Sequence, residues 1–320
     1  MQRLNLLIAT DLLPKSDRAL VRGSRLACAL EADVSLLHVL SAEQPVDETR
    51  TERTEHALTR MRDLVRPLPW PVRSAPHTLV RVGTPPWRTV VETITTLRAD
   101  MVVLGSHERR RGQDRIATAL GTTLAARVLA ARACPTLIVR EPAANSYRRV
   151  LLALDMSSNA ETVIRAVESL VLTPEADASV LHAFDTPYLG TVEHLDSGRG
   201  MSARYRSLWE SQATVNVRAL MRRASTDFTR YGIQIEEAPP ARAILEAMNH
   251  QQPDLLVMGT SGRGPWRRAL LGSVANEVLN RAWCDVLIVP QGSFERKLAG
   301  PQGFTHRPVP QVHPYRHRWH

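Results

Sequence analysis

Short runs of leucine, isoleucine and valine alternate along the chain with longer segments in which apolar residues recur at helical spacing. The runs contain few polar residues, which is typical of strands buried on both faces of a parallel sheet. Segments such as residues 16–32 (SDRALVRGSRLACALEA) and 159–172 (NAETVIRAVESLVL) predict amphipathic helices instead. Strands are predicted at 4–10, 34–40, 77–82, 100–105 and 136–140, and again at 149–155, 178–184, 233–237, 254–259 and 285–289. This alternation predicts a doubly wound α/β fold.

The pattern occurs twice because the sequence repeats itself. EADVSLLHVL (31–40) returns as EADASVLHAF (175–184), and CPTLIV (134–139) returns as CDVLIV (284–289). Asp11, at the end of the first strand, corresponds in the same way to Asp155. Matches in the same order indicate a tandem duplication. We therefore expect domains at 1–146 and 147–292, each with a five-stranded parallel sheet, followed by a disordered, basic, His- and Pro-rich tail at 293–320.

The second half carries a glycine-rich loop, GTSGRGPWRRALLGS, at residues 259–273. It follows a predicted strand and precedes a predicted helix. Glycine lets the backbone approach a ligand closely, and the unpaired N–H groups of a helix N-terminus bind anions. An ordinary polar turn has the same composition, so the loop alone leaves both interpretations open. Ser273 is expected to cap the helix that follows.

Other nucleotide-binding folds lack support. A P-loop requires a Gly-Lys pair, which this chain does not contain, and the first strand of neither half is followed by a GxGxxG loop. Over residues 1–290 the chain resembles the universal stress protein family in its tandem two-domain form. The resemblance is carried by the spacing G-x2-G-x9-G-[ST] at Gly259, Gly262, Gly272 and Ser273. It implies two Rossmann-like domains of the adenine nucleotide alpha hydrolase type, related by a pseudo-twofold axis.

The resemblance also implies an ATP or other adenine-nucleotide site in the second half, with or without Mg. Asp155 would lie near adenine or ribose, and Ala183 would offer backbone groups to adenine. Glycines would make room for ribose and phosphate, the start of the last helix would bind the β- and γ-phosphates, and an arginine of the loop could add charge. The expected nucleotide-binding residues are Asp155, Ala183, Met258, Gly259, Gly262, Arg263, Gly264, Gly272, Ser273 and Val274.

The first half departs from this pattern. Its loop, GSHERRRGQDRIATALGT (105–122), has Glu108 where the second half has Gly262, and its spacing is longer. We interpret this site as degenerate and mainly structural; a different anion held by the arginines at 109–111 is the alternative. In the second half, residues 185–206 are expected to form a long inserted loop, either a lid or a surface loop.

Charge and composition limit the kinds of binding partner that we expect for this chain. The net charge is +9, but arginines are scattered along helical segments without interleaved aromatic residues, so nucleic-acid binding is not expected. No apolar run is long enough for a membrane span, which favours a cytoplasmic protein. Neither catalytic nor metal-ligating residues are predicted: His38 and His182 occupy matching strand positions and are expected in the core, as are Cys134 and Cys284.

Three functions stay open: a regulatory or protective ATP-binding protein of the stress response, a slow ATP hydrolase, and a scaffold with a vestigial site. No carboxylate or lysine is placed for phosphoryl transfer, which favours binding over catalysis. The strands at 136–140 and 285–289 are expected to pair within the chain, joined by the linker 141–147, because related single domains pair through this edge. A further homodimer is left open.

Overall fold

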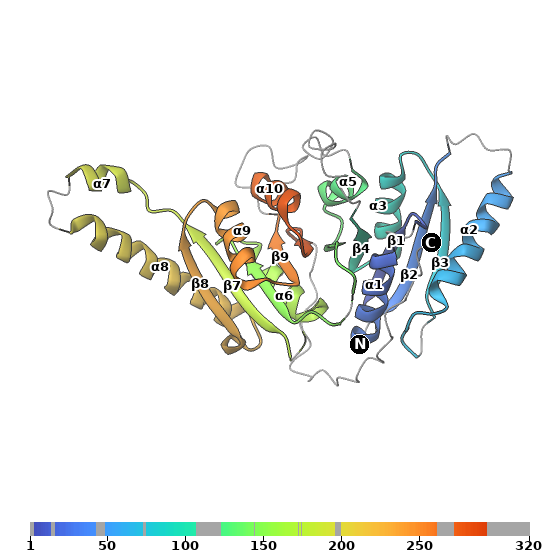
Figure 1. Ribbon diagram of the computed structural model, residues 1–320, viewed down its shortest axis with the longest axis horizontal. Coiled ribbons are helices and arrows are strands. Elements are labelled where there is room, and N and C mark those ends of the chain that lie inside the picture. Colours follow the sequence, from blue (N-terminus) through green and yellow to red (C-terminus); the bar gives the residue numbers. More distant parts are fainter. Residues whose placement is uncertain are drawn as a thin grey trace, which may run out of the picture. The chain divides into compact units, whose positions relative to one another are not determined.

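The computed structural model of the 320-residue chain describes residues 3–13, 17–42, 49–72, 75–106, 123–143, 145–171, 173, 175–195, 200–260 and 272–292 (Figure 1). Strands and helices alternate through both halves. The strands are β1 Asn5–Thr10, β2 Asp33–Leu40, β3 His77–Val82, β4 Met101–Gly105, β5 Thr136–Val139, β6 Arg149–Ala153, β7 Asp177–Phe184, β8 Tyr231–Glu237, β9 Leu255–Gly259 and β10 Asp285–Val289. The helices are α1 Asp17–Leu30, α2 Arg50–Val65, α3 Pro86–Leu97, α5 Leu124–Ala131, α6 Ala160–Leu170, α7 Leu189–Leu195, α8 Met201–Ala224, α9 Pro240–Gln251 and α10 Ser273–Arg281, with a short 3-10 helix at Phe228–Arg230.

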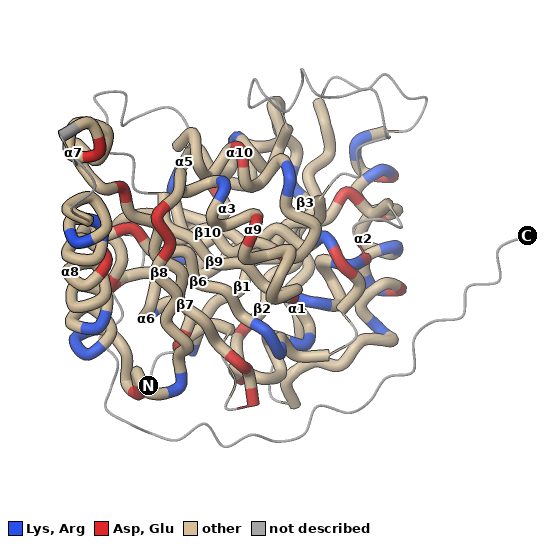
Figure 2. The backbone as a smooth tube through the Cα atoms, turned by 60° about the vertical axis from the view of Figure 1, so that its left-hand side comes forward, with Lys and Arg blue, Asp and Glu red and all other residues tan. Residues whose placement is uncertain are grey.

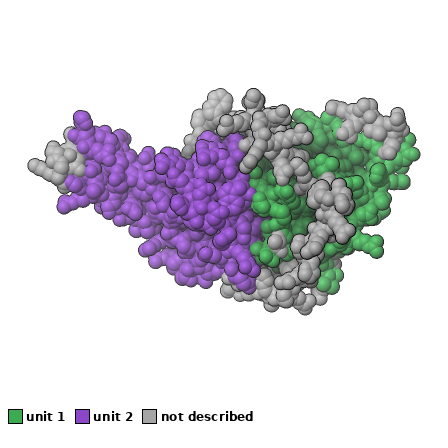
Figure 3. Space-filling view, in the orientation of Figure 1, with its two compact units in different colours: residues 1–115, 122–146, 297–320 green, residues 116–121, 147–296 purple. Residues whose placement is uncertain are grey.

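The chain divides into two compact units, with a boundary between Ser146 and Tyr147 (Figure 3). In the first unit the strands follow the order β3-β2-β1-β4-β5, and in the second β8-β7-β6-β9-β10. All of these neighbours within a unit are parallel. The predicted doubly wound α/β fold and all ten predicted strands are therefore confirmed. The expected pairing of 136–140 with 285–289 stays a prediction.

Helices cover each set of strands in two groups. In the first unit α3 packs against α5 and against the strands, while α1 packs on β1, β4 and β5. In the second unit α6 packs against α8, and α9 against α10. The strands are consequently buried on both faces: every residue of β5 and of β10 is buried. This explains why the strands appear in the sequence as nearly continuous apolar runs.

Close packing of helix α1 on the first sheet depends on one glycine. A Cβ atom at Gly23 would lie 2.4 Å from Ile8 Cδ1, a residue of β1 with no exposed surface. Ala19, Leu20 and Ala27 lie on the same buried face of the helix. The spacing of these small and apolar residues is what lets the helix approach the strand closely.

The segment 185–206 is not the long loop that the sequence suggested. It contains helix α7 and the first residues of α8, with residues 196–199 outside the described residues. The prediction was wrong because the first half of α8 buries no face: all of its fully buried side chains lie at or beyond Ala213. A helix without a buried face lacks the broad apolar stripe, with residues at i, i+3 and i+4, by which a core helix is recognised in a sequence. None of the helices described here is long and apolar enough to cross a membrane.

Helix α8 is fastened to the second unit at its C-terminal end by a buried carboxylate. Glu168 of α6 is 8% exposed and accepts hydrogen bonds from Ser225 Oγ (2.5 Å), from Thr226 N and Oγ1 (both 3.1 Å to Oε2) and from Tyr231 Oη (3.1 Å). Burial, and then the neighbouring Glu168 charge, raise the pKa of Tyr231 well above its usual value. The phenol therefore remains a donor to Glu168. This cluster joins α6, the end of α8 and the start of β8.

Replacement of the buried carboxylate should reduce stability far more than replacement of an exposed one on the same helix. Glu168→Ala leaves several buried donors without an acceptor, so we expect a loss of about 2–4 kcal/mol in the free energy of unfolding. Glu161→Ala removes only partly exposed ion pairs to Arg165 and Arg223 and should cost less than about 1 kcal/mol. Urea unfolding of both variants measures the difference, and similar losses would contradict the structural role of Glu168.

Candidate functional site

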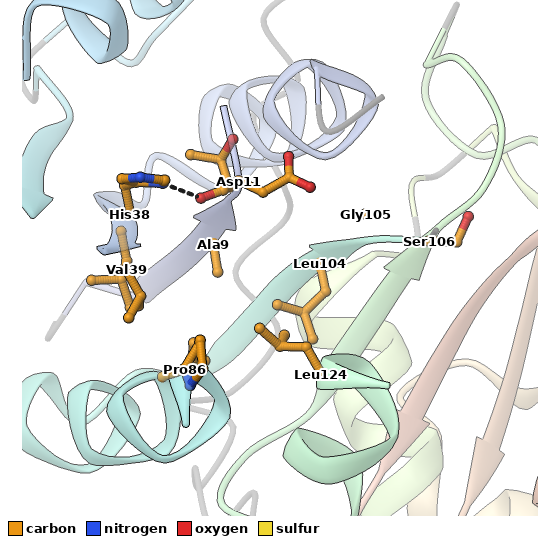
Figure 4. A pocket seen from close by; sticks show the side chains of 12 residues that line it. Ala9, Asp11, His38, Val39, Pro86, Leu104, Gly105, Ser106 and Leu124 are labelled. Carbon is orange, nitrogen blue, oxygen red and sulfur yellow. Dashed lines mark hydrogen bonds between the residues drawn. The ribbon is translucent and has the colours of Figure 1, made fainter. Parts of the chain in front are cut away.

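A cavity of about 180 Å³ lies at the carboxyl ends of β1, β2 and β4 in the first unit (Figure 4). It lies where the strand order reverses, between β1 and β4, which is where doubly wound sheets bind ligands. Helices α3 and α5 complete its wall. The lining residues are Ala9, Thr10, Asp11, Leu37, His38, Val39, Pro86, Val90, Leu104, Gly105, Ser106 and Leu124.

Polar groups at this edge are fixed by the backbone. His38 Nδ1 lies 2.9 Å from the Thr10 carbonyl oxygen, so it carries the hydrogen, because a carbonyl only accepts. Asp11 Oδ1 accepts a hydrogen bond from Leu13 N at 2.9 Å. Burial lowers the pKa of His38, although the bond to Thr10 and the nearby Asp11 charge act in the opposite direction. The imidazole at the cavity wall is therefore neutral at pH 7.

The second unit repeats this arrangement. His182 Nδ1 lies 2.9 Å from the Leu154 carbonyl oxygen, as His38 does from Thr10. Asp155 Oδ1 accepts hydrogen bonds from Ser157 N at 3.3 Å and Ser157 Oγ at 2.5 Å. Both histidines are thus hydrogen-bonded at the sheet edge. His182 is buried, as the sequence predicted, whereas His38 is only partly buried because it lines the cavity.

The matching cysteines also have packing roles. Cys134 and Cys284 are both buried, and neither forms a disulfide with another described residue. Burial raises the pKa of Cys134 to about 12, which keeps it protonated and unreactive. No cluster of potential metal ligands occurs within the described parts of the chain.

The strand register brings several of the predicted nucleotide-binding residues together. Ala153, the last residue of β6, pairs with Met258 of β9 and with Leu181 of β7. Asp155 follows β6 by two residues, so it lies at the same edge as Ala183 near the end of β7 and Gly259 at the end of β9. The carboxyl ends of parallel strands meet at one edge, which explains the placement.

The start of helix α10 belongs to the same edge. Strands β9 and β10 are parallel neighbours, so the helix that connects them begins at the carboxyl end of β9. Gly272 is the N-cap, and Ser273 and Val274 are the first two helical residues. The expected capping role of Ser273 was therefore wrong: Ser273 is exposed inside the first turn, and no described side chain caps this helix. Gly262, Arg263 and Gly264 lie outside the described residues.

One polar residue at this edge was missed. Thr260 directly follows β9 and is 2% exposed, and its hydroxyl has no hydrogen-bond partner among the described residues. Its backbone N–H donates to the Val289 carbonyl oxygen at 3.2 Å, which fixes its position. No pattern in the sequence pointed to Thr260, because threonine next to a loop glycine is common.

The first unit uses a different helix start. Helix α5 has Thr123 as its N-cap, and the hydroxyl of Thr123 accepts a hydrogen bond from Ala126 N at 3.2 Å. The N-terminal N–H groups of α5 are therefore partly satisfied within the protein, whereas those of α10 have no side-chain partner of this kind in the part of the chain that the structure describes. An uncapped N-terminus is the better anion site.

Comparisons with known proteins agree on one family. The sequence model of the universal stress protein family matches residues 3–140 and again residues 146–290. A universal stress protein of Mycolicibacterium smegmatis is 25% identical over 305 residues, which cover 89% of this chain and 96% of the relative. The universal stress protein A homolog 2 of Coxiella burnetii is 30% identical over 154 residues, covering 45% of this chain and 96% of the relative.

Solved structures agree on the fold. A universal stress protein from Archaeoglobus fulgidus has a TM-score of 0.61 at 16% identity, covering 89% of this chain and 96% of that one. A protein of unknown function from Pseudomonas aeruginosa has a TM-score of 0.60 at 17% identity, covering 89% of this chain and 92% of that one. Both cover nearly the whole tandem arrangement.

The lowered pKa of His38 should make stability depend on pH. Unfolding exposes the ring, so below about pH 6.5 the unfolded chain binds a proton that the folded chain excludes. The contribution of His38 to the free energy of unfolding is present above that pH and is lost as the pH falls. His38→Asn keeps a donor for the Thr10 carbonyl but does not titrate, so it should reduce the loss of stability between neutral pH and pH 5.

The exposed His250 supplies the control for this measurement. His250→Asn makes the same substitution at an exposed site, so it measures the effect of the substitution itself on urea unfolding. If the pH dependence of unfolding is the same in His38→Asn as in the unaltered protein, the histidine at the cavity wall does not contribute to it as described.

Proposed function

Because this chain belongs to the universal stress protein family, we propose that it is a regulatory ATP-binding protein with one nucleotide site, in its second half. The site comprises Asp155, Ala183, Met258, Gly259, Gly262, Arg263, Gly264, Gly272, Ser273 and Val274, with the phosphates on the start of α10. Adenine would lie toward the ends of β6 and β7. The M. smegmatis relative, which aligns along both halves, supports the assignment of the family and not that of the ligand.

The observation that carries this proposal is the conformation of Gly272. Its φ of −54° and ψ of 152° are accessible to any residue. A Cβ atom at Gly272 would meet nothing within 4 Å among the described residues, whereas one at Gly83 would lie 2.0 Å from Thr89 Oγ1. The described fold therefore requires glycine at 83 and does not require it at 272. Space for an anion beside the uncapped helix start is a reason for glycine at 272 that packing does not supply.

The buried hydroxyl of Thr260 adds independent support. A buried polar group without a partner costs about 1–3 kcal/mol, so such groups normally have a function or a ligand. Thr260 follows Gly259 at the carboxyl edge where ribose and phosphate would lie. A ligand hydroxyl or phosphate oxygen would supply the missing hydrogen bond.

Binding is favoured over hydrolysis by the position of the acidic residue. Asp155 follows β6, and its Oδ1 atom already accepts two hydrogen bonds from Ser157. In the proposed orientation it lies at the adenosine end of the ligand, away from the γ-phosphate. Phosphoryl transfer requires a group that orients the nucleophile and a carboxylate that holds Mg²⁺, and neither role falls to a proposed site residue.

The cavity of the first unit favours a second, separate candidate: a small ligand bound at the ends of β1, β2 and β4. Its walls are mostly apolar with a neutral imidazole, which suits an uncharged ring better than a phosphate. Titration with ligands that differ in their number of phosphates distinguishes the two candidates. Only the affinity of the nucleotide site in the second unit should depend on that number.

We expect isothermal titration to show one ATP per chain. Gly262→Glu copies Glu108 of the first half and should abolish binding by placing bulk and negative charge near the phosphates. Gly190→Glu, at an exposed position of α7 where a Cβ meets nothing within 4 Å, is the matched control and should bind normally. Two equivalent ATP sites, or full binding by Gly262→Glu, would refute the single site.

Gly272→Ala should separate ligand binding from folding. We expect ATP affinity to fall at least about tenfold, equal to about 1.4 kcal/mol, because the methyl group occupies the anion space. Stability should change by no more than about 1 kcal/mol. Gly23→Ala should do the reverse, lowering stability by about 1–3 kcal/mol through the clash with Ile8 while the folded protein binds ATP normally.

Isothermal titration calorimetry measures the ATP affinity of each variant, and urea unfolding measures its stability. Equal ATP affinity in Gly272→Ala and the unaltered protein would show that glycine at 272 has no role in binding.

A further inference from the structure

Helix α8 projects from the second unit as an arm. Figure 1 shows the N-terminal part of α8, with α7 beside it, extending beyond the strands β7 and β8. The C-terminal part is anchored through its buried residues and through Glu168. On the side of α8 that faces the sheet, Arg206 forms ion pairs with Glu193 of α7 (3.3 Å) and with Glu237 of β8 (2.8 Å). These ion pairs hold α7, α8 and the sheet together.

The outer face of this arm carries an apolar stripe. Met201, Leu208 and Val215 are spaced by seven residues, and they are 48%, 68% and 60% exposed. A spacing of seven residues places side chains in one row along a helix. The row lies opposite the face that buries Ala213 and Val217, so it points away from the unit. It spans about 21 Å, or four helical turns.

Basic residues follow the stripe along one side. Arg204, Arg218 and Arg222 are exposed and, by helical geometry, lie within one flank of the row. Figure 2 shows basic residues, in blue, along the backbone of α8. The single acidic residue of the helix, Glu210, lies about 160° around the helix from the row, on the opposite side. The outer face is therefore apolar along its centre and positive along one edge.

We propose that the outer face of α8 is a docking site for an acidic amphipathic helix of another protein. A partner helix with apolar residues at the same seven-residue spacing would cover Met201, Leu208 and Val215, and its acidic residues would face Arg204 and Arg218. Apolar contact would supply most of the affinity and charge would select the partner. This inference is independent of the nucleotide site.

Charge excludes two segments of this protein itself as occupants of the outer face of α8. A second copy of α8 would place the basic flank formed by Arg204, Arg218 and Arg222 against the same flank of its partner. The one glutamate of the helix lies on the opposite side and would not offset this charge. The tail at 293–320 has five basic residues and one acidic residue, so it would be repelled as well. A membrane surface fits less well than a helix, because interfacial helices bury a broad apolar face and this row is one side chain wide.

A designed peptide tests the face directly. The probe is a fluorescent three-heptad helix with leucine at every seventh position and flanking glutamates, titrated with the full-length protein and followed by fluorescence anisotropy. Leu208→Gln/Val215→Gln should weaken binding at least about tenfold. Leu13→Gln/Val72→Gln is the matched control: it removes one leucine and one valine that are 54% and 97% exposed elsewhere, and it should bind normally.

Charge reversal gives a second readout. Arg204→Glu/Arg218→Glu should lose the acidic peptide and bind a version with lysine in place of glutamate. Since all four arm positions are exposed, each variant should unfold in urea like the unaltered protein.

Four results would overturn the proposal. They are absence of binding to the acidic peptide, an equal loss in the Leu13→Gln/Val72→Gln control, self-association that requires Leu208 and Val215, and binding to phosphatidylserine vesicles that requires the same two residues.

Discussion

Burial of parallel strands on both faces is the constraint on which the rest of this structure depends. Strands such as β5 and β10 have no exposed residues, so their backbone groups must pair with neighbouring strands and helices must cover both faces. Parallel strands then end at a common edge. The repeated aspartates and histidines, Asp11 with His38 and Asp155 with His182, are placed by that edge, and each histidine fixes the end of the preceding strand.

The two halves show how one scaffold supports different edges. In the first, Thr123 caps helix α5 and a mostly apolar cavity lies beside His38. In the second, the N-cap of α10 is Gly272, and no described side chain caps the helix or lies within 4 Å of a Cβ atom at this position. The strands beneath are equivalent in order and direction. Differences at a few residues beyond the strand ends are enough to change which ligand an edge accepts, because the strands fix position and the loops supply chemistry.

Helix α8 combines a fixed end with a free one. The hydrogen bonds of Glu168 to Ser225, Thr226 and Tyr231 hold its C-terminal end against α6 and β8. These bonds fix the direction in which the helix, with its exposed row of Met201, Leu208 and Val215, projects from the unit. A rigid helix that presents exposed leucine and valine loses little conformational freedom on binding, which favours use of the arm as a docking surface.

The sequence by itself determined the tandem repeat, the ten strands and the family. Apolar runs are local patterns that a sheet buried on both faces requires, and the glycine spacing is a local pattern that carries the family resemblance. The sequence also placed Asp155, Ala183 and Gly259 at one edge, since parallel strands leave little choice. It missed helix α7 and the start of α8, which bury no face and so lack the broad apolar stripe of a core helix. The sequence analysis assigned Ser273 a capping position that the structure assigns to Gly272, and it did not reveal that the Thr260 hydroxyl has no partner among the described residues. Only the tertiary structure decided these points, because caps, buried polar groups and exposed helix faces depend on which neighbours the fold brings into contact.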